Sequence, residues 1–164
     1  HQALRLAQSG VRTFRTTSMG RLFDTVAAMA GFTREVTFEG QAAMWLEHAA
    51  GASPTRTPYP FPIDGAELDF RPLLAAIAAD RGDPARIARS FHQAVAEAVV
   101  RAACQLCEAH SIPTVVLSGG VFQNTLLLEL IQRAMPPSLR VWTNSAAPPN
   151  DGGVSLGQAA LACF

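Results

Sequence analysis

Apolar residues recur at helical spacing through most of the 164-residue chain. An early case is the stripe formed by Leu22, Val26 and Met29, which lie along one face of a helix. Thr17 or Ser18 can serve as its N-cap. The same spacing and capping signals predict further helices over residues 3–8, 39–50, 72–79, 83–110, 126–135 and 154–163.

Two short apolar runs interrupt this helical pattern in the second half of the chain, at residues 114–117 and 139–143. The first run is of the kind that lies buried on both faces of a sheet. A weaker strand pattern falls at residues 67–70, after a proline-rich stretch at 54–62 that predicts an extended surface loop. Because helices and strands alternate after residue 83, the order predicts a helix-rich α/β fold with a small parallel sheet.

Composition narrows the class of protein. The formal net charge is +0, so the chain has no electrostatic footprint for nucleic acid or for an anionic membrane. No apolar run reaches the length of a transmembrane helix, and no signal peptide opens the chain. The 3 cysteines do not make a disulfide framework. These features predict a soluble, cytoplasmic protein without nucleic-acid or membrane partners.

A pair of glycines, Gly119 and Gly120, follows the first predicted strand and precedes a helix. The carboxyl end of a parallel strand is where α/β proteins bind ligands, and a helix N-terminus there offers free backbone N–H groups. Without a Cβ, glycine lets a phosphate or a ribose lie on the backbone. Asn124, in the expected first helical turn, could also bond a ligand. From these residues alone, a nucleotide-binding turn and a tight turn with only a structural role are equally good interpretations.

Other acidic residues offer candidate chemistry. Asp151 precedes a second glycine pair after the second strand, and helix capping is favoured there over a metal ligand. Gly20 would let a ligand approach its helix closely. Asp24 lies one turn later on the same helix, and its carboxylate could accept hydrogen bonds from ribose hydroxyls. Taken alone, Asp24 is more often a solvated surface acid. Glu39 fits the first turn of the helix at 39–50.

Four stretches, taken together, resemble one family. They are "TTSMGRLFDTVAAMAG", "FEGQAAMWLE", "SFHQAVAEA" and "VVLSGGVFQNTLL", the last followed by "PPNDGGVSLGQAA". Together they are similar to the C-terminal part of HypF, the carbamoyltransferase of [NiFe]-hydrogenase maturation. The resemblance implies a Kae1/TsaD-like domain of the actin-like ATPase (ASKHA) superfold, of which this chain would be the C-terminal lobe. It also implies that ATP lies in a cleft between two lobes.

The resemblance assigns roles to single residues. Gly119, Gly120 and Asn124, with Ser118 directly before them, should line the nucleotide. Asp151 should be a metal ligand, which reverses the preference for capping. The same comparison implies that Gly20 and Asp24 meet the ribose and that Glu39 belongs to the nucleotide site.

The resemblance also implies a reaction. A carbamoyl group derived from carbamoyl phosphate is activated with ATP as carbamoyl-adenylate and passes to the C-terminal cysteine of a HypE-like acceptor protein. It is later dehydrated toward the cyanide ligands of the hydrogenase iron. A divalent metal (zinc, iron or magnesium) would be completed by residues outside this chain.

The chain departs from the family pattern in what it lacks. It has no acylphosphatase-like, zinc-finger or YrdC-like segment, and no HxxxH motif. We therefore expect residues 1–164 to be a fragment without the upstream lobe, with at most about millimolar affinity for ATP and no activity alone. An O-carbamoyltransferase of small-molecule metabolism and a non-catalytic remnant or interaction module remain alternative interpretations.

Overall fold

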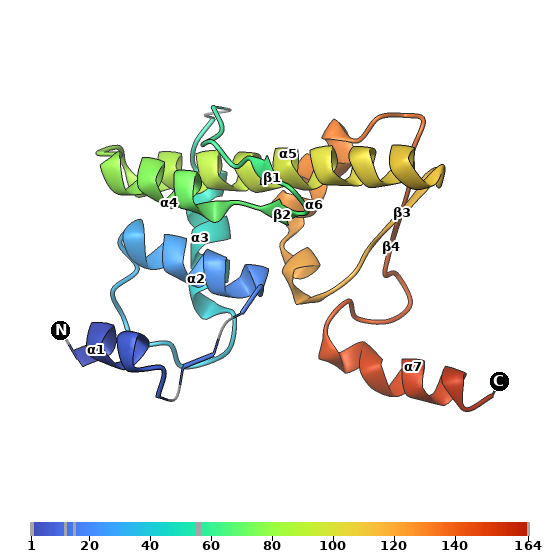
Figure 1. Cartoon of the computed structure of the whole chain (residues 1–164), viewed down its shortest axis with the longest axis horizontal. Coiled ribbons are helices and arrows are strands. Elements are labelled where there is room, and N and C mark those ends of the chain that lie inside the picture. The colour runs from blue at the N-terminus through green and yellow to red at the C-terminus, as the bar shows by residue number, and fades with distance from the viewer. Residues whose placement is uncertain (1, 12, 15, 55–56, 164) are drawn as a thin grey trace.

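Helices dominate the computed structural model, which describes residues 2–11, 13–14, 16–54 and 57–163 (Figure 1). Each predicted helix is present, with its ends shifted by a turn or less. Two short 3-10 helices, η1 and η2, were not predicted. In chain order the elements are α1 (Gln2–Ser9), α2 (Met19–Met29), α3 (Gln41–Gly51), β1 (Ile63–Asp64), β2 (Glu67–Leu68), α4 (Phe70–Ala79), α5 (Pro84–His110), β3 (Thr114–Leu117), η1 (Gly120–Gln123), α6 (Thr125–Ala134), β4 (Arg140–Thr143), η2 (Asp151–Gly153) and α7 (Val154–Leu161).

Helix α5 is the central element of the fold and crosses most of the molecule (Figure 1). Its start follows the predicted capping signal, because the Asp83 carboxylate accepts from the backbone N–H of Arg86 and Pro84 occupies the first turn. Helices α3 and α6 pack against α5, and α2 packs against α3. Their shared core contains fully buried Phe23, Leu46 and Phe91, so these helices bury their apolar stripes on one another.

The proline-rich stretch is held on the helices by side-chain bonds. The Tyr59 hydroxyl donates to the Asp80 carboxylate at the end of α4 (2.5 Å), and Arg101 of α5 donates to the carbonyl of Phe61 (2.6 Å). Residues 55–56 of the predicted loop lie outside the described residues. The weak strand pattern at 67–70 corresponds to β2, which pairs with β1 as an antiparallel hairpin.

Strands β3 and β4 form the predicted parallel pair, in which Val116 lies opposite Trp142. One face of the pair packs on the helices through Val115 and Val141. On the other face Val116 is 65% exposed and Trp142 is 62% exposed. The expectation that β3 is buried on both faces is therefore wrong, since among the described residues no second layer covers this side of the sheet.

Helix α7 extends away from the rest of the molecule at its C-terminal end (Figure 1). None of its described residues is buried, and Val154, Leu156 and Leu161 expose large apolar surfaces. Within the described ranges, no helix combines the length and apolar character needed to cross a membrane. The architecture is thus the expected helix-rich α/β fold with a small parallel sheet.

Candidate functional site

The two glycine pairs meet at one edge of the parallel sheet. The backbone N–H of Gly119, which follows β3, donates to the carbonyl of Pro149, which follows β4, over 2.7 Å. This bond is possible because parallel strands present their carboxyl ends at the same edge. The two glycine turns therefore lie side by side.

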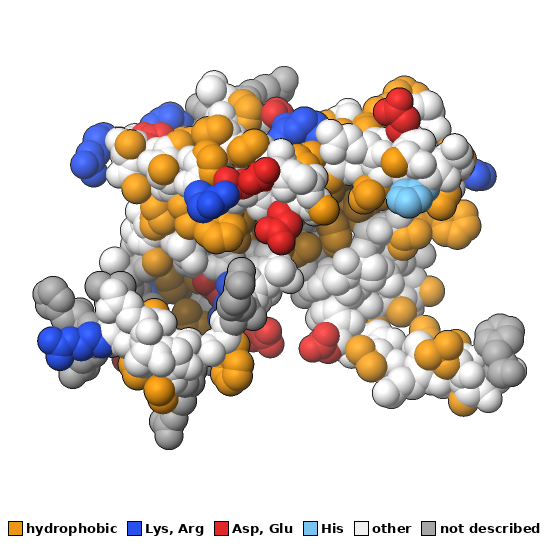
Figure 2. Space-filling model, in the orientation of Figure 1, with side chains coloured by type: hydrophobic (Ala, Val, Ile, Leu, Met, Phe, Trp, Pro, Cys, Tyr) orange, Lys and Arg blue, Asp and Glu red, His pale blue; other side chains and the backbone are white. Residues whose placement is uncertain are grey.

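A cavity of about 810 Å³ opens beside these turns, a volume in the usual range for small-molecule sites. Figure 2 shows the hollow between the two lower parts of the molecule, with acidic side chains on both sides. Its wall is built by α2, α3, η1 and the turn before α7. The lining residues are Ser18, Gly20, Arg21, Phe23, Asp24, Glu39, Gly40, Ala43, Met44, Glu47, Gly120, Val121, Gln123, Asn124, Asn150 and Asp151.

The two adjacent glycines of the first turn have different reasons to be glycine. Gly119 has φ of +108°, a conformation that side-chain-bearing residues rarely adopt. Gly120 has no such constraint, and a Cβ there would meet nothing closer than the Cβ of Asn150 at 3.8 Å. The turn alternative therefore accounts for Gly119, whereas Gly120 leaves open space toward the cavity that a ligand could use.

Protein side chains already accept two of the first backbone donors of α6. The Asn124 side chain is the N-cap and accepts from the N–H of Leu127 (2.8 Å), and Glu47 of α3 accepts from the N–H of Leu126 (3.1 Å). Among the described residues, no acceptor takes the N–H of Gly120 or of Val121. Backbone N–H groups without a protein acceptor therefore remain on η1 in this region, whereas two of the first donors of α6 are already taken.

Asn124 is also bonded to a buried histidine. His92 of α5 is fully buried, its Nδ1 lies 2.8 Å from the Ala88 carbonyl oxygen, and its Nε2 lies 2.9 Å from Asn124 Nδ2. Burial lowers the pKa of His92 to about 4, so the ring is neutral at pH 7. His92 therefore makes structural hydrogen bonds through both ring nitrogens.

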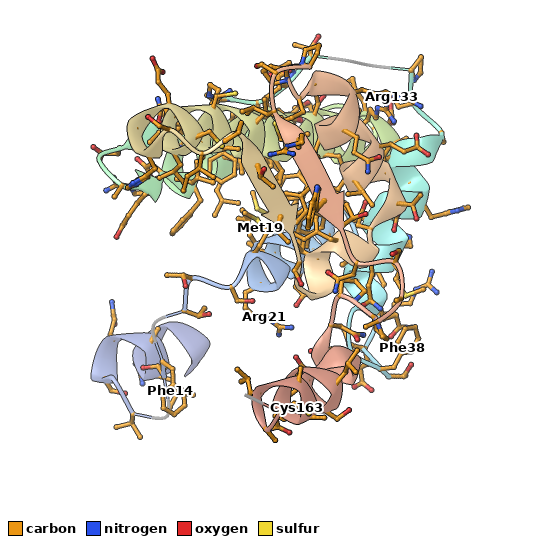
Figure 3. All side chains as sticks on the ribbon, turned by 90° about the vertical axis from the view of Figure 1, so that its right-hand side faces the viewer. Phe14, Met19, Arg21, Phe38, Arg133 and Cys163 are labelled. Atoms are coloured by element: carbon orange, nitrogen blue, oxygen red, sulfur yellow. The ribbon has the colours of Figure 1, made fainter. Side chains whose placement is uncertain are left out.

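Helix α2 brings Gly20 and Asp24 to the cavity, as the sequence predicted for a helix with a glycine one turn before an acid. A Cβ at Gly20 would meet only the Ser18 hydroxyl at 3.6 Å, so the protein itself does not require glycine there. Asp24 is held by Arg21, with 2.9 Å between Nη2 and Oδ2. Arg21 projects from α2 toward the space between α2 and α7 (Figure 3).

Glu39 lines the cavity but does not belong to a helix. Helix α3 begins at Gln41, and Gly40 is its N-cap with φ of +80°. Because the left-handed turn at Gly40 precedes the helix, Glu39 lies outside it, and the expectation that Glu39 belongs to the first helical turn is wrong. Among the described residues, Glu39, Glu47, Asp24 and Asp151 give the wall four carboxylates, against the guanidinium of Arg21.

Asp151 is exposed and does not cap the helix that follows it. The cap of η2 is Asn150, whose Oδ1 accepts from the N–H of Gly152 (3.0 Å). The capping alternative for Asp151 is therefore wrong, and its carboxylate has no hydrogen-bond or ion-pair partner in the described part of the chain. Nor do the described residues contain a group of three or more His, Cys, Asp or Glu side chains able to hold a metal. Asp151 could supply one ligand only.

Most of the residues singled out from the sequence line this cavity, while other lining residues were missed. Ser118 is exposed and lies outside the lining set. Glu47 was missed, although Gly40, Met44 and Glu47 recur at helical spacing and so mark the face of α3 that meets the cavity. Asn150 was missed because Asn and Asp are equally good N-cap residues, and only the bond from the N–H of Gly152 to Asn150 shows which of the two neighbours is the cap.

Comparison with known proteins agrees with this geometry. A family model described as "Carbamoyltransferase, Kae1-like Domain, second subdomain" matches residues 1–158. Carbamoyltransferase HypF of Synechocystis sp. is 39% identical over 150 residues, covering 87% of this chain and 19% of the relative. That of Rhodobacter capsulatus is 37% identical over 162 residues, covering 98% of this chain and 21% of the relative.

Solved structures show the same relationship. Full-length HypF in the phosphate- and nucleotide-bound form has a TM-score of 0.86 at 36% identity, covering 97% of this chain and 22% of that one. HypF of T. kodakarensis has a TM-score of 0.89 at 29% identity, covering 98% of this chain and 22% of that one.

The fold and the cavity thus define a lobe of the Kae1-like, actin-like class. The chain belongs to the HypF carbamoyltransferase family, within the second subdomain of its Kae1-like domain. It spans about one fifth of the length of the Synechocystis and Rhodobacter relatives.

Proposed function

We propose that this chain is the nucleotide-binding part of a HypF-type carbamoyltransferase that uses ATP and carbamoyl phosphate in [NiFe]-hydrogenase maturation. The acceptor is the C-terminal cysteine of a HypE-like protein. The observation that carries the proposal is the convergence of Gly20, Asp24, Gly120 and Asp151 on one cavity from separate segments of the chain. A relative of the same fold is described in a phosphate- and nucleotide-bound form, which supports a nucleotide as the ligand.

Each wall of the cavity suits one part of ATP. The N–H groups of Gly120 and Val121 can donate to phosphate oxygens, because Gly120 has no Cβ that would prevent close approach. Asp24 retains one carboxylate oxygen, Oδ1, that Arg21 does not hold, and this oxygen can accept from a ribose hydroxyl. This assignment places the phosphates between η1 and the turn at Asp151.

The charge of the cavity makes a divalent cation part of the proposal. Four carboxylates and one guanidinium line the wall, so a polyphosphate would be repelled without added positive charge. A cation held by Asp151 and phosphate oxygens would offset that repulsion, and Mg²⁺ is commonly held by one or two carboxylates plus phosphates. The remaining protein ligands would come from outside the described residues.

The proposed transfer is a substitution at the carbamoyl carbon. The acceptor cysteine thiolate attacks this carbon, a C–S bond forms, and the C–O bond to AMP breaks. AMP leaves with the bonding electron pair, and the thiol proton has already passed to solvent. The residues of this chain would hold the adenylate and orient its carbamoyl group, which favours the substitution by proximity.

A chimera tests the proposal in a complete protein. Residues 1–158 would replace the matching segment of Rhodobacter capsulatus HypF, and mass spectrometry would follow ATP-dependent carbamoylation of a peptide ending in the HypE cysteine. We expect the chimera to be active and its Asp151→Ala variant to be inactive. Full activity of the Asp151→Ala chimera would show that Asp151 is not a required metal ligand. Robust activity of the 164-residue chain alone would contradict the need for metal ligands outside it.

A further inference from the structure

The bond between His92 and Ala88 fixes the tautomer of the imidazole. The Ala88 carbonyl oxygen can only accept a hydrogen bond, and it lies 2.8 Å from His92 Nδ1. Nδ1 must therefore carry the hydrogen. Because the ring is buried and neutral, Nε2 is left without a hydrogen and acts as an acceptor.

That acceptor fixes the orientation of the Asn124 amide. The nitrogen of the amide must face His92 Nε2 (2.9 Å), which leaves Oδ1 to accept from the N–H of Leu127 (2.8 Å). In the flipped orientation two acceptors would face each other at His92, and two donors would face each other at Leu127. Both hydrogen bonds would be lost inside the protein, where unmade bonds are expensive.

Aromatic neighbours hold the imidazole in place. The Phe23 ring lies edge-on to His92, with 5.3 Å between ring centroids, and Phe91 does so at 5.7 Å. A ring held in this way cannot exchange its two nitrogens by turning over without disturbing the core. The fixed imidazole therefore determines which end of Asn124 points where.

The remaining hydrogen of the Asn124 amide has no acceptor among the described residues, and Asn124 lines the cavity. We propose that His92 is a positioning residue of the nucleotide site, and that it orients Asn124 so that a hydrogen-bond donor faces the ligand. The ligand atom at this point is then an acceptor, such as a ribose or phosphate oxygen. This inference rests on the proposed nucleotide site.

The tautomer of His92 can be measured without any ligand. In the ¹⁵N-labelled 164-residue chain at pH 7, long-range ¹H–¹⁵N correlation spectra distinguish the two neutral tautomers and the imidazolium. We expect the Nδ1–H tautomer. Either the Nε2–H tautomer or the imidazolium would overturn the inference, because the Asn124 amide would then turn its oxygen toward His92.

Substitutions test the effect on binding, with ATP and Mg²⁺ as the probe in chemical-shift titrations. His92→Phe keeps an aromatic ring but removes the acceptor, and we expect about tenfold weaker binding because the Asn124 amide is no longer oriented. His92→Gln offers a carbonyl oxygen near the Nε2 position and should restore most of the affinity. His110→Gln, at the exposed end of the same helix, is the matched control and should bind like the wild type.

Asn124→Asp separates capping from donation. The aspartate retains an N-cap acceptor for Leu127 but has no N–H for the ligand, so the helix should persist while ATP binding weakens at least about tenfold. This variant decides the question if His92→Phe fails to fold. Unchanged ATP affinity in Asn124→Asp or in folded His92→Phe would overturn the inference. If the wild type binds no ATP, the proposed function fails, and the tautomer still decides whether His92 orients Asn124.

Discussion

The helices around α5 and the strand segment, that is β3, β4 and α7 with the turns at η1 and η2, contribute to the same cavity but are stabilised very differently. Among the helices, Phe23, Leu46 and Phe91 are at most 1% exposed. In the strand segment, Val116 and Trp142 are mostly exposed, and α7 has no buried residue. The comparison shows that the cavity needs both regions, whereas most of the buried core lies in the helices.

The largest expected effect tests this difference directly. Phe91→Ala removes a fully buried ring from the helical core and should lower the free energy of unfolding by about 3–5 kcal/mol. Leu156→Ala removes a side chain of α7 that is 59% exposed, and should change it by no more than about 0.5 kcal/mol. Urea unfolding measures both. Similar losses for the two variants would mean that α7 is packed in solution.

The second prediction concerns pH and the helical core. The folded-state pKa of His92, about 4, lies below the ordinary value of 6.5 because the ring is buried. The unfolded chain therefore binds more protons between these values, and stability should fall as the pH decreases from 6.5 to 4, by up to about 1.4 kcal/mol per pH unit.

Replacing the titrating group checks this origin of the pH dependence. His92→Gln should flatten the profile in that window, while His110→Gln should leave it unchanged. Urea midpoints at closely spaced pH values give the comparison. A His92→Gln profile as steep as that of the wild type would assign the effect to other groups.

The third prediction compares two aspartates that begin helices in the two regions. Asp83 accepts from the N–H of Arg86, so Asp83→Ala should cost about 1 kcal/mol of stability. Asp151 makes no such bond, because Asn150 is the cap, and Asp151→Ala should leave stability unchanged. Thermal unfolding of the two variants decides it, and equal losses would restore the capping role of Asp151.

The smallest expected effect lies on the open face of the sheet. Trp142→Ser should alter the free energy of unfolding by less than about 0.5 kcal/mol, since the ring is 62% exposed. Chemical unfolding at low and high protein concentration would measure it. A loss of about 2 kcal/mol would show that this face is covered in solution, for example by a second copy of the chain.

The sequence predicted the elements that depend on local chemistry. Asp83 and Pro84 marked the start of α5, and the apolar spacing after Ser18 marked α2, because capping and periodicity act within a few residues. The exposure of Val116 could not be predicted in this way. Burial on both faces of a strand depends on which elements cover the sheet, and the residues of the strand do not specify this.

The candidate site also contains residues that local sequence patterns predict and residues that they do not. The positions of Gly20, Asp24 and Gly120 at one cavity followed from matched motifs, and the structure brings them together. The roles of Glu47 and Asn150 follow from contacts between residues far apart in the chain or from the geometry of a turn. The spacing of Gly40, Met44 and Glu47 marks the face of α3 that meets the cavity, but it does not predict that Glu47 accepts from the N–H of Leu126.

The central claim is that the helices and the strand segment together form a nucleotide site. The most direct measurement is a chemical-shift titration of the ¹⁵N-labelled chain with ATP and Mg²⁺, compared with its Gly120→Val variant. We predict shifts at Gly20, Asp24, Gly120, Val121 and Asp151, with a dissociation constant of about 1 mM or weaker, and their loss in the variant. ATP-induced shifts confined to other residues, or equal binding by Gly120→Val, would contradict the claim.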